Sequence, residues 1–489
     1  MSKNRVAKVT IRMYRIGTGD CFVLQFHRAD QTVCSMLIDF GSCMGTKADF
    51  DRFATEIRDH VNGRIDVLVV THEHLDHIIG FERGSDVFQT IEIGQVWVAW
   101  TEDPTDKLAK RLKSSYGKDR QALAAAVAKM EMMVNDPNYR AMVAAEWDAS
   151  ARLKRQEAFV AGLQDLLFHY TGTANAAAAM TSQTQRAMEY VLHKISKQTK
   201  EPPFYCVPGR QEPKVKGLDG VRFYVLGPPR DESYLKQEES SDEVYTRKRG
   251  FADDPAFSDA LHDDAAKLEK IRPFEKSFSF EEKEAVKIRS EQLAGRNAWR
   301  NISLDWLTSA GHLALRLDRY MNNMSLALAI ELEDSGKVLL FPGDAQSGNW
   351  RSWHDDDLRW TVGSGKDSQT ICARDLLERT VFYKVGHHLS HNGTASRSGL
   401  ELMNSDDLVA FAPLDENKIS AGWGRTMPSP GVLEELIRRT KGRIFRIDTK
   451  LESDPRAKAE RRKFSRSDDE LFKGAYEITD SYIEYTITL

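Results

Sequence analysis

Cysteine is scarce in this sequence, and long apolar runs are missing from it. The five cysteines lie far apart and form no C-x-x-C pair, which argues against a thiolate zinc site and against a disulfide framework. No apolar run approaches the roughly 20 residues that span a bilayer, and the first residues alternate apolar with polar side chains, unlike a signal peptide. The formal net charge of -4 gives no global argument for binding to nucleic acid or membrane. We therefore expect a soluble protein of the reducing cytoplasm with no membrane contact.

The 489 residues alternate between strand-rich and helix-rich stretches. Short β-branched and aromatic runs bounded by Gly, Asp and Asn predict strands, whereas Ala-rich and charge-rich stretches predict helices. Neither strand-rich half holds a complete set of the polar groups described below, so one α/β core interrupted twice is the simplest organisation. The predicted segments are the first half of the core (1–103), a helical insertion (104–202), core strands (203–230), a charged, mainly helical insertion (231–318) and the second half of the core (319–489).

The most informative stretch is "VVTHEHLDHIIG" at residues 69–80. It ends an apolar strand, and in extended backbone His72 and His74 point to the same side, so that both imidazoles can bind one cation. Asp76 and His77 follow where the chain turns, and they can reach a second cation. Imidazole and carboxylate ligands suit zinc, manganese or iron. The spacing therefore predicts two divalent metal ions, with zinc and manganese both open.

Further candidate ligands follow other predicted strands at their carboxyl ends. In "LLFPGDA", Gly343 permits the sharp turn that exposes Asp344, whose carboxylate can bridge two cations. In "FYKVGHH", either His387 or His388 can complete the second metal, and we take His387 as the ligand. Asp39 in "LIDFGS" can orient a ligand histidine from outside the metal's own ligand set. Four such strand ends on one sheet edge would converge on a single site.

Together these motifs resemble the metallo-β-lactamase superfamily. The His-x-His-x-Asp-His stretch, "FPGD" and "GHH" carry the resemblance, and with "RIGTGDCFVLQF", "LIDFGS", "VLGPP" and "NNMSLALAIE" they follow the pattern of the hydrolase domain of ComEC-type DNA-uptake proteins. The match runs from residue 15 to about residue 395 and omits both insertions. It implies an α/β fold of the αββα sandwich type with the metals at one sheet edge. ComEC-type proteins also carry a membrane channel, which we do not expect here, so a transport role is not implied.

The third ligand of the first metal departs from the superfamily pattern. Many members supply a histidine from a segment between the opening motif and the bridging aspartate. Here that place holds Asn322, Asn323 and Ser325, and His312 lies in a predicted helix just before it. The third ligand is therefore open between His312, Asn322, Asn323 and none.

Several residues are assigned to supporting positions around the metals. They are Asp20 of "GTGD", Asp39, Asn323 and Ser325. In "GHHLS", Leu389 stands where ComEC-type sequences commonly have a glycine, so the geometry of this turn is not fixed by the resemblance.

The residues and the resemblance imply hydrolysis by a dinuclear centre. Two cations lower the pKa of a water that bridges them, and the resulting hydroxide attacks phosphorus or a carbonyl carbon while the metals stabilise the negative charge. Asp76 takes part in catalysis through the metal, and His388 or His391 can protonate the leaving group. No side-chain nucleophile is needed.

A phosphodiesterase or nuclease is the favoured function, because a phosphate oxygen can fill the open ligand position. Lys384, Lys418 and Arg425 can bind phosphates, although scattered basic residues are more often solvated surface. Trp350 and Trp353 can stack on bases, although tryptophans three apart on a helix are more often core.

Two other functions compete with the phosphodiesterase or nuclease hypothesis. The first is a lactone or thioester hydrolase that uses the same metals. The second is an assembly or binding component of a multi-protein system, such as one that defends against foreign DNA, in which catalysis is secondary. The helical insertions offer surfaces for a protein partner or for self-association.

Overall fold

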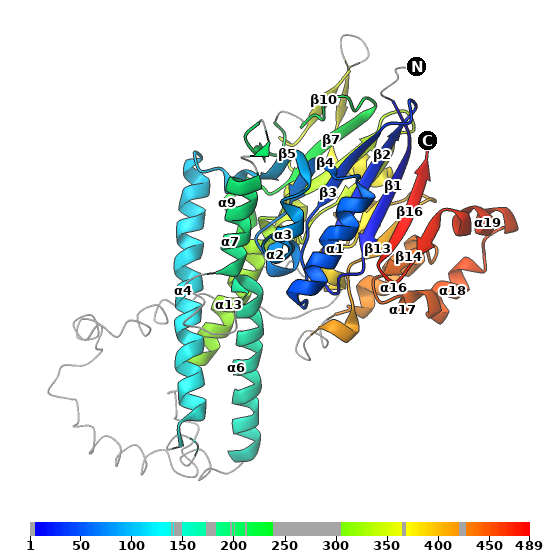
Figure 1. Ribbon diagram of the computed structural model, residues 1–489. Helices are drawn as coiled ribbons and strands as arrows, with labels where there is room; N and C mark the ends of the chain where they lie inside the picture. The colour runs from blue at the N-terminus through cyan, green and yellow to red at the C-terminus, as the bar shows by residue number, and fades with distance from the viewer. Residues whose placement is uncertain are drawn as a thin grey trace, which may run out of the picture. The chain divides into compact units, whose positions relative to one another are not determined.

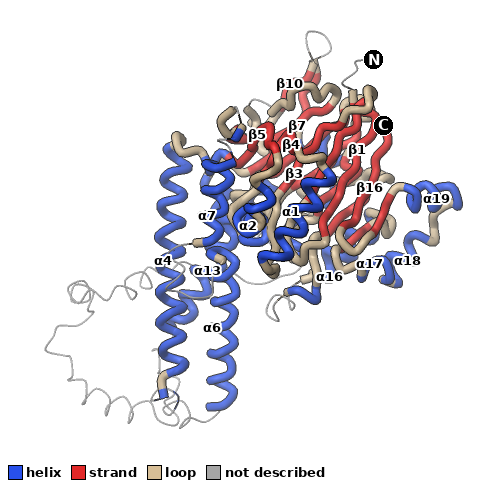
Figure 2. The backbone as a smooth tube through the Cα atoms, viewed as in Figure 1, coloured by secondary structure: helices blue, strands red, loops and turns tan. Residues whose placement is uncertain are grey.

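The protein is a mixed α/β structure with two large sheets, shown as a ribbon in Figure 1 and as a coloured tube in Figure 2. The computed structural model describes residues 5–137, 140, 149–172, 182–195, 198–199, 201–210, 213–237, 305–363, 368–419 and 427–489. The chain divides into two compact units. The first contains Met1–Lys113, Gln183–Arg249 and Arg319–Leu489, and the second contains Ser114–Ser182 and Gly250–Asp318. Among the described residues, no helix has the length and apolar character that a membrane span requires.

The larger sheet of the first unit has eight strands. Their order is β15 (Tyr476–Ile478), β16 (Tyr482–Thr488), β1 (Val6–Tyr14), β2 (Phe22–Arg28), β3 (Val33–Ile38), β4 (Arg64–Val70), β5 (Glu92–Ala99) and β6 (Phe204–Cys206). The pairs from β15 to β3 are antiparallel, and the pairs from β3 to β6 are parallel. The carboxyl ends of β3 and β4 therefore lie at the same edge of the sheet.

The second sheet has six strands. Their order is β14 (Ile444–Arg446), β13 (Val409–Ala412), β12 (Thr380–Lys384), β9 (Lys337–Phe341), β8 (Ala327–Leu332) and β7 (Val221–Gly227). The predicted hairpin of β8 and β9 is present as an antiparallel pair, whereas β9, β12, β13 and β14 are parallel neighbours. The carboxyl ends of β9 and β12 thus also share one edge.

Aromatic side chains join the two sheets face to face. The ring centroids of Phe22 and Phe341 are 5.7 Å apart, and Phe223 lies 6.4 Å from Phe26 and 5.0 Å from Trp97. These rings belong to one buried apolar cluster that contains residues of both sheets. Edge-to-face contacts of this kind add to the stabilisation from buried apolar area, so the two sheets form one core.

Helices pack on the outer faces of both sheets. On the larger sheet, Phe40 contacts Phe50 of α1 (Lys47–His60), Phe81 of α2 (Leu75–Arg83) and Phe88 of α3 (Ser85–Phe88). On the second sheet, a separate apolar cluster includes residues of α14 (Ser347–Ser352), α15 (Ala373–Glu378) and α16 (Pro430–Arg439). The sequence correctly predicts the start of α16, with Ser429 at the N-cap position and Pro430 in the first turn.

The remaining elements of the first unit are short. They are the strands β10 (Trp360–Val362) and β11 (Gln369–Ile371) and the helices α7 (Gln183–Glu189), η3 (Tyr190–Ile195), α9 (Glu232–Leu235), α17 (Lys450–Ser453), α18 (Pro455–Arg461) and α19 (Arg466–Gly474), together with the 3-10 turns η1 (Trp100–Glu102), η7 (Gly386–Leu389), η8 (Leu400–Leu402) and η9 (Glu416–Lys418).

Long helices form the described part of the second unit. They come from α4 (Lys107–Asn135), α6 (Ala149–Thr171) and α13 (Asp305–Asn323). The hydroxyl of Tyr170 donates to the Ala314 carbonyl over 2.9 Å, and Arg316 contacts Asp119 over 3.0 Å, so α13 contacts both of the other helices. The helices expected in residues 104–202 are thus present, although the compact unit begins at Ser114. Residues 238–304, most of the predicted charged insertion, lie outside the described residues.

Candidate metal centre

Polar residues gather where four core strands end. Asp39 follows β3, His72 and His74 follow β4, Asp344 follows β9, and His388 follows β12. These side chains are at most 4 % exposed. The predicted convergence of strand ends is therefore observed in the described part of the first unit, but the strands belong to two sheets and not to one: β3 and β4 lie in the larger sheet, and β9 and β12 lie in the second.

The second half of the His-x-His-x-Asp-His motif lies in a helix. α2 begins at Leu75 with His74 as its N-cap, so Asp76 and His77 occupy its first turn. Gly41 lets the chain pass close to this turn, because a Cβ atom there would lie 2.4 Å from the His77 nitrogen. The Asp20 amide donates to the Asp76 carbonyl over 2.8 Å. The "GTGD" and "LIDFGS" segments thus hold the start of α2 in place.

Four side chains direct ligand atoms toward one another. Nε2 of His77 lies 3.0 Å from Oδ2 of Asp344 and 3.9 Å from Oδ2 of Asp76. Nε2 of His388 lies 2.6 Å from Oδ2 of Asp76 and 3.4 Å from Oδ2 of Asp344. Ligand atoms of Asp20, His77, Asp344 and His388 all lie within 4.8 Å of one another. This buried Asp/His cluster could hold a metal ion.

Two buried atoms of the cluster test its fit to a cation. His77 Nε2 and Asp344 Oδ2 are both shielded from solvent, and neither makes a hydrogen bond of acceptable geometry within the described part of the chain, despite their separation of 3.0 Å. Buried polar atoms are normally hydrogen-bonded, because leaving one without a partner costs about 1–3 kcal/mol. A nitrogen and a carboxylate oxygen that point into the same space instead of at each other suit two ligands of one cation.

Hydrogen bonds from neighbouring side chains fix the orientation of the histidines that follow β4. Asp39, at φ 57°, accepts from Nδ1 of His77 over 2.7 Å and from the Thr71 hydroxyl over 2.6 Å. Because the Thr71 proton is used in this way, its oxygen can accept from Nδ1 of His72 at 3.1 Å. Nε2 of His72 then faces Nδ1 of His74 over 3.0 Å. Asp39 therefore orients ligand histidines, the role expected of it.

His388 is presented by a left-handed turn. His387, His388 and Leu389 have φ values of 44°, 50° and 64°, a conformation that costs a non-glycine residue roughly 1–2 kcal/mol. The turn is held by the Ser429 amide, which donates to the Leu389 carbonyl over 2.7 Å, and by Nδ1 of His388, which donates to the Pro413 carbonyl over 2.9 Å. Leu389 thus adopts the backbone conformation that a glycine would adopt more easily.

His387 points elsewhere. Nδ1 of its ring lies 2.8 Å from the Ser390 hydroxyl and 3.2 Å from Oδ1 of Asn392, while its backbone amide donates to Oδ1 of Asp344 over 3.0 Å. The geometry therefore places His388, and not His387, among the candidate ligand atoms. This reverses the roles expected for the two neighbours.

Three further candidates lie around the cluster. The Ser325 hydroxyl accepts from the Asp344 amide over 3.1 Å, and Oδ1 of Asn323 accepts from the Asn349 amide over 3.0 Å. Both residues thus support the loop that carries Asp344. His391 is half-buried and does not belong to the group of converging ligand atoms among the described residues.

The alternatives for a third ligand of the first metal differ in their surroundings. Oδ1 of Asn322 is buried and has no hydrogen-bond partner among the residues that the structure describes, and Nδ2 of the same side chain lies 3.5 Å from Nε2 of His387. Oδ1 of Asn323 already accepts a hydrogen bond from the Asn349 amide. His312 lies in α13, and its side chain is outside the described residues. Asn322 is therefore the alternative with an available oxygen.

The carboxylates and imidazoles shift one another's pKa. Burial alone would lower the pKa of His388, but the Asp344 and Asp76 carboxylates raise it to about 10. The pKa of His77 is raised well above its ordinary value, since four carboxylates outweigh its burial. Burial raises the pKa of Asp344, but the nearby positive charges of Lys384, His77 and His388 lower it by more. The pKa of Asp344 therefore lies well below its ordinary value. The two imidazoles therefore favour their positively charged form, and the Asp344 carboxyl group favours its negatively charged form.

Sequence reasoning missed the burial of Lys384. Its side chain is 1 % exposed and its Nζ lies 3.0 Å from Oδ1 of Asp344, whereas a surface position was expected. Lys384 is the last residue of β12, TVFYK, and every residue of this strand is buried. The signal in the sequence is the position of the lysine at the end of this largely apolar run.

A cysteine also lies at the cluster, although none was expected there. The Cys43 thiol hydrogen-bonds the Asp76 carboxylate, and burial raises the pKa of the thiol well above its ordinary value. Cys43 closely follows the "LIDFGS" loop, which carries it to the start of α2.

The other proposed substrate contacts have different outcomes. Lys418 is exposed in the turn after β13, and Arg425 lies outside the described residues. Trp350 and Trp353 are fully buried, so the prediction of core tryptophans is confirmed and they cannot stack on bases.

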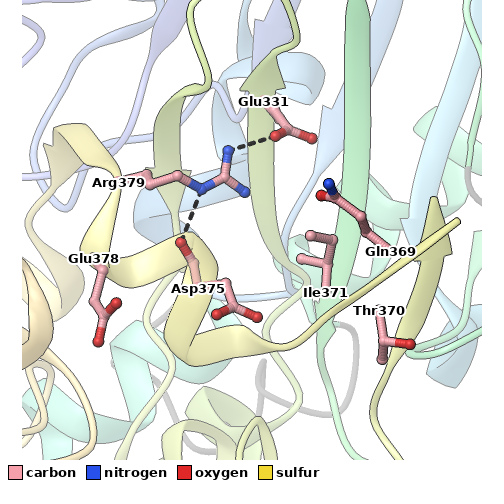
Figure 3. Close-up of a pocket in the computed structure, with 7 residues that line it drawn as sticks. All are labelled: Glu331, Gln369, Thr370, Ile371, Asp375, Glu378 and Arg379. Atoms are coloured by element: carbon pink, nitrogen blue, oxygen red, sulfur yellow. Dashed lines mark hydrogen bonds and ion pairs between the residues drawn. The ribbon is translucent and has the colours of Figure 1, made fainter. Parts of the chain in front are cut away.

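A separate open pocket of about 630 Å³ lies beside β8, β11 and α15 (Figure 3). Arg379 crosses it, donating from Nε to the Asp375 carbonyl and contacting the Glu331 carboxylate. The Asp375 carboxylate accepts from the Cys372 amide and caps α15. These groups are used to hold α15 against β8, so we assign the pocket no chemistry.

Searches with this sequence and structure against protein-family models, curated proteins and solved structures gave no match. The functional conclusion therefore rests on the geometry of the cluster.

Proposed function

We propose that this protein is a metal-dependent hydrolase with the αββα fold of the metallo-β-lactamase superfamily, most similar in its motifs to the hydrolase domain of ComEC-type proteins. The observation that carries the proposal is the convergence of His77, His388, Asp76 and Asp344 on one space inside the fold. The order of motifs in the sequence and the two packed sheets with outer helices support the same assignment.

Buried charge supports a centre with two cations. The buried carboxyl groups at the centre are Asp20, Asp39, Asp76 and Asp344, and among the described residues the buried ammonium of Lys384 contacts two of them, Asp20 and Asp344. With neutral imidazoles the side chains carry a net charge of -3. One divalent cation leaves this charge negative, whereas two leave a single positive charge that an anionic substrate oxygen can neutralise. Uncompensated buried charge is costly, so the pair is the better balanced state.

The proposed ligands form two groups. His77, Asp76, Asp344 and His388 would hold one cation. His72 and His74 would hold the other, with Asp344 as a ligand available to both, and Asn322 offers a buried side-chain oxygen as a third ligand. Asp39, Ser325, Asn323 and Asp20 keep these groups in position.

Divalent cations at such a centre act as Lewis acids and lower the pKa of bound water. The chain's own residues set the conditions for this chemistry. Burial excludes bulk water from Asp76 and Asp344, and the tie from Asp39 to His77 keeps Nε2 of that ring directed into the centre. No buried serine or cysteine nucleophile is required.

A phosphodiester, of a nucleic acid or a small molecule, is the proposed substrate class. It has two non-bridging oxygens that can each approach one cation. Cleavage of a lactone or a thioester is the alternative chemistry for the same centre. A role limited to assembly is less well supported, because a binding component has no need for this arrangement of buried carboxylates and histidines.

The test is a substrate panel on the purified chain reconstituted with zinc or manganese. We expect cleavage of single- or double-stranded nucleic acid or of an aryl phosphodiester, and its loss in Asp76→Asn and Asp344→Asn. Asp356→Asn is the matched control, because Asp356 is fully exposed, and it should retain activity. Hydrolysis of lactones or thioesters with no phosphodiester cleavage would replace the substrate class.

A further inference from the structure

Lys384 is a buried lysine at the centre of the metal cluster. Its ammonium lies 2.5 Å from Oδ2 of Asp20, 3.0 Å from Oδ1 of Asp344 and 2.8 Å from the carbonyl oxygen of Gly343. An ammonium has three protons to donate, and these three oxygens accept them all. The side chain therefore has a complete set of partners away from solvent.

The surroundings of this ammonium resemble those of a bound cation. Two carboxylate oxygens and a backbone carbonyl are the ligand types that hard cations take in proteins. The carboxyl groups of Asp20 and Asp344 are both buried, at 1 % and 0 % exposure. Without a positive charge between them, the two carboxylates would repel each other in a region of low dielectric constant.

The two oxygens of Asp344 have separate partners. Oδ1 accepts from the Lys384 ammonium and from the His387 amide, whereas Oδ2 faces Nε2 of His77 and Nε2 of His388. The lysine thus occupies one side of the carboxylate and leaves the other side to the metal. It also fixes the rotation of the carboxylate before a metal binds.

We infer that Lys384 serves as a built-in cation, which occupies the position between Asp20, Asp344 and the Gly343 carbonyl that a small cation would otherwise take. It is a positioning residue that acts through Asp20 and Asp344. The inference relies on the proposed function only in taking Asp344 as a metal ligand.

A vacant lysine position should accept a small cation from solution. Lys384→Ala removes the ammonium and its stem but leaves the oxygens of Asp20, Asp344 and Gly343. Ammonium or methylammonium fits such a space and can donate to these oxygens, whereas tetramethylammonium has no proton to donate and is larger. In Lys384→Met the side chain fills the space without a charge, so no added cation should bind.

The experiment measures thermal unfolding of the metal-free chain in chelator, at constant ionic strength. We expect both variants to unfold about 5 °C or more below the wild type, because each leaves two carboxylates without their buried partner. Methylammonium should raise the unfolding temperature of Lys384→Ala toward that of the wild type, and the effect should saturate with methylammonium concentration. Tetramethylammonium should not raise it. Lys384→Met, the wild type and the exposed-lysine control Lys473→Ala should not respond. Equal effects of the two cations on Lys384→Ala would overturn the inference.

A second measurement decides the matter if Lys384→Ala does not fold. Adding Asp20→Asn to Lys384→Met removes the charge that the lysine balanced, so the double variant should regain much of the lost stability. If the double variant instead loses as much stability as Lys384→Met and Asp20→Asn lose in sum, the inference is overturned. Both measurements exclude divalent metal, so their failure is distinct from a failure of the proposed hydrolase, which the metal content and activity of the wild type decide.

Discussion

Nε2 of His77 lies 3.0 Å from Oδ2 of Asp344, and neither atom makes a hydrogen bond to any residue that the structure describes. Two ligands that each lie about 2.1 Å from one cation, at an angle of 90–110°, are about 3.0–3.4 Å apart. The His388 to Asp344 separation of 3.4 Å falls in the same interval. These separations are compatible with the proposed metal ligands, and the following predictions test that proposal.

Asp39→Asn tests the support of His77. Asparagine tolerates the positive φ of this position, so the fold should be retained. Its amide nitrogen, however, cannot accept from Nδ1 of His77 or from the Thr71 hydroxyl. We expect the metal affinity to fall by about 10–100-fold, measured by competition with a chelating indicator. An affinity equal to that of the Asp356→Asn control would contradict the support assigned to Asp39.

His387→Asn and His388→Asn separate the two neighbouring histidines. Asparagine is suited to the left-handed turn at both positions, so both proteins should fold. Loss of His388 should lower the metal affinity by more than about 100-fold, beyond the effect of a supporting residue. Loss of His387 should change it by less than about tenfold. The opposite order would restore His387 as the ligand and contradict the geometry.

Metal binding should release protons. The Asp344 and Asp76 carboxylates raise the pKa of His388 to about 10, so its ring carries a proton on both nitrogens at pH 7.5 in the metal-free chain, and the carboxylates around His77 shift its pKa in the same direction. A cation on Nε2 must displace that proton. We expect release of at least one proton per chain, that of His388, and an apparent affinity that rises toward pH 10. Calorimetry in buffers of different ionisation enthalpy measures the number, and a value near zero would rule out these ligands.

The same shifts set the pH dependence of stability without metal. A pKa raised on folding gives stability that is complete below the unfolded value of about 6.5 and is lost as pH rises through the folded value. The metal-free chain should therefore lose this contribution between about pH 6.5 and 10. Thermal unfolding in chelator across this interval is the measurement. His388→Asn should show a smaller loss, and an equal loss would assign the effect to other groups.

Gly41→Ala tests the close approach that holds α2. A Cβ atom at this position would lie 2.4 Å from backbone atoms of Asp76 and His77, so backbone must move. We expect a destabilisation of about 2–4 kcal/mol in denaturant unfolding, together with weaker metal binding. Gly162→Ala is the matched control. Its Cβ would meet nothing within 4 Å in α6, so it should stabilise the chain by about 0.5–1 kcal/mol. Equal effects of the two substitutions would remove the packing argument.

Sequence reasoning was sufficient where local pattern decides position. A polar residue that directly follows an apolar strand lies at the strand's end, so Asp39, His72 and Asp344 were placed correctly at strand ends, although β9 belongs to the other sheet from β3 and β4. The run "SLALAIELEDSGKVLLFPGDA" predicted a hairpin-like pair of strands, and β8 and β9 form an antiparallel pair. The candidate ligands of the opening motif follow from spacing of this kind.

Tertiary structure decided what the sequence left open. The choice between His387 and His388 depends on three successive left-handed residues, a conformation that their side-chain types do not favour. The inward position of Lys384 depends on two carboxylates from distant segments, Asp20 and Asp344. The contact of Cys43 with Asp76 likewise depends on how two loops pack, so spacing along the chain could not show it.

The most direct test of the central claim is the metal content of the purified chain after reconstitution with zinc or manganese and removal of loosely bound ions. The account predicts close to two divalent ions per wild-type chain, and fewer in Asp344→Asn, whose circular dichroism should match the wild type because the substitution conserves volume. A wild-type chain that is folded but never retains more than trace metal would contradict the account.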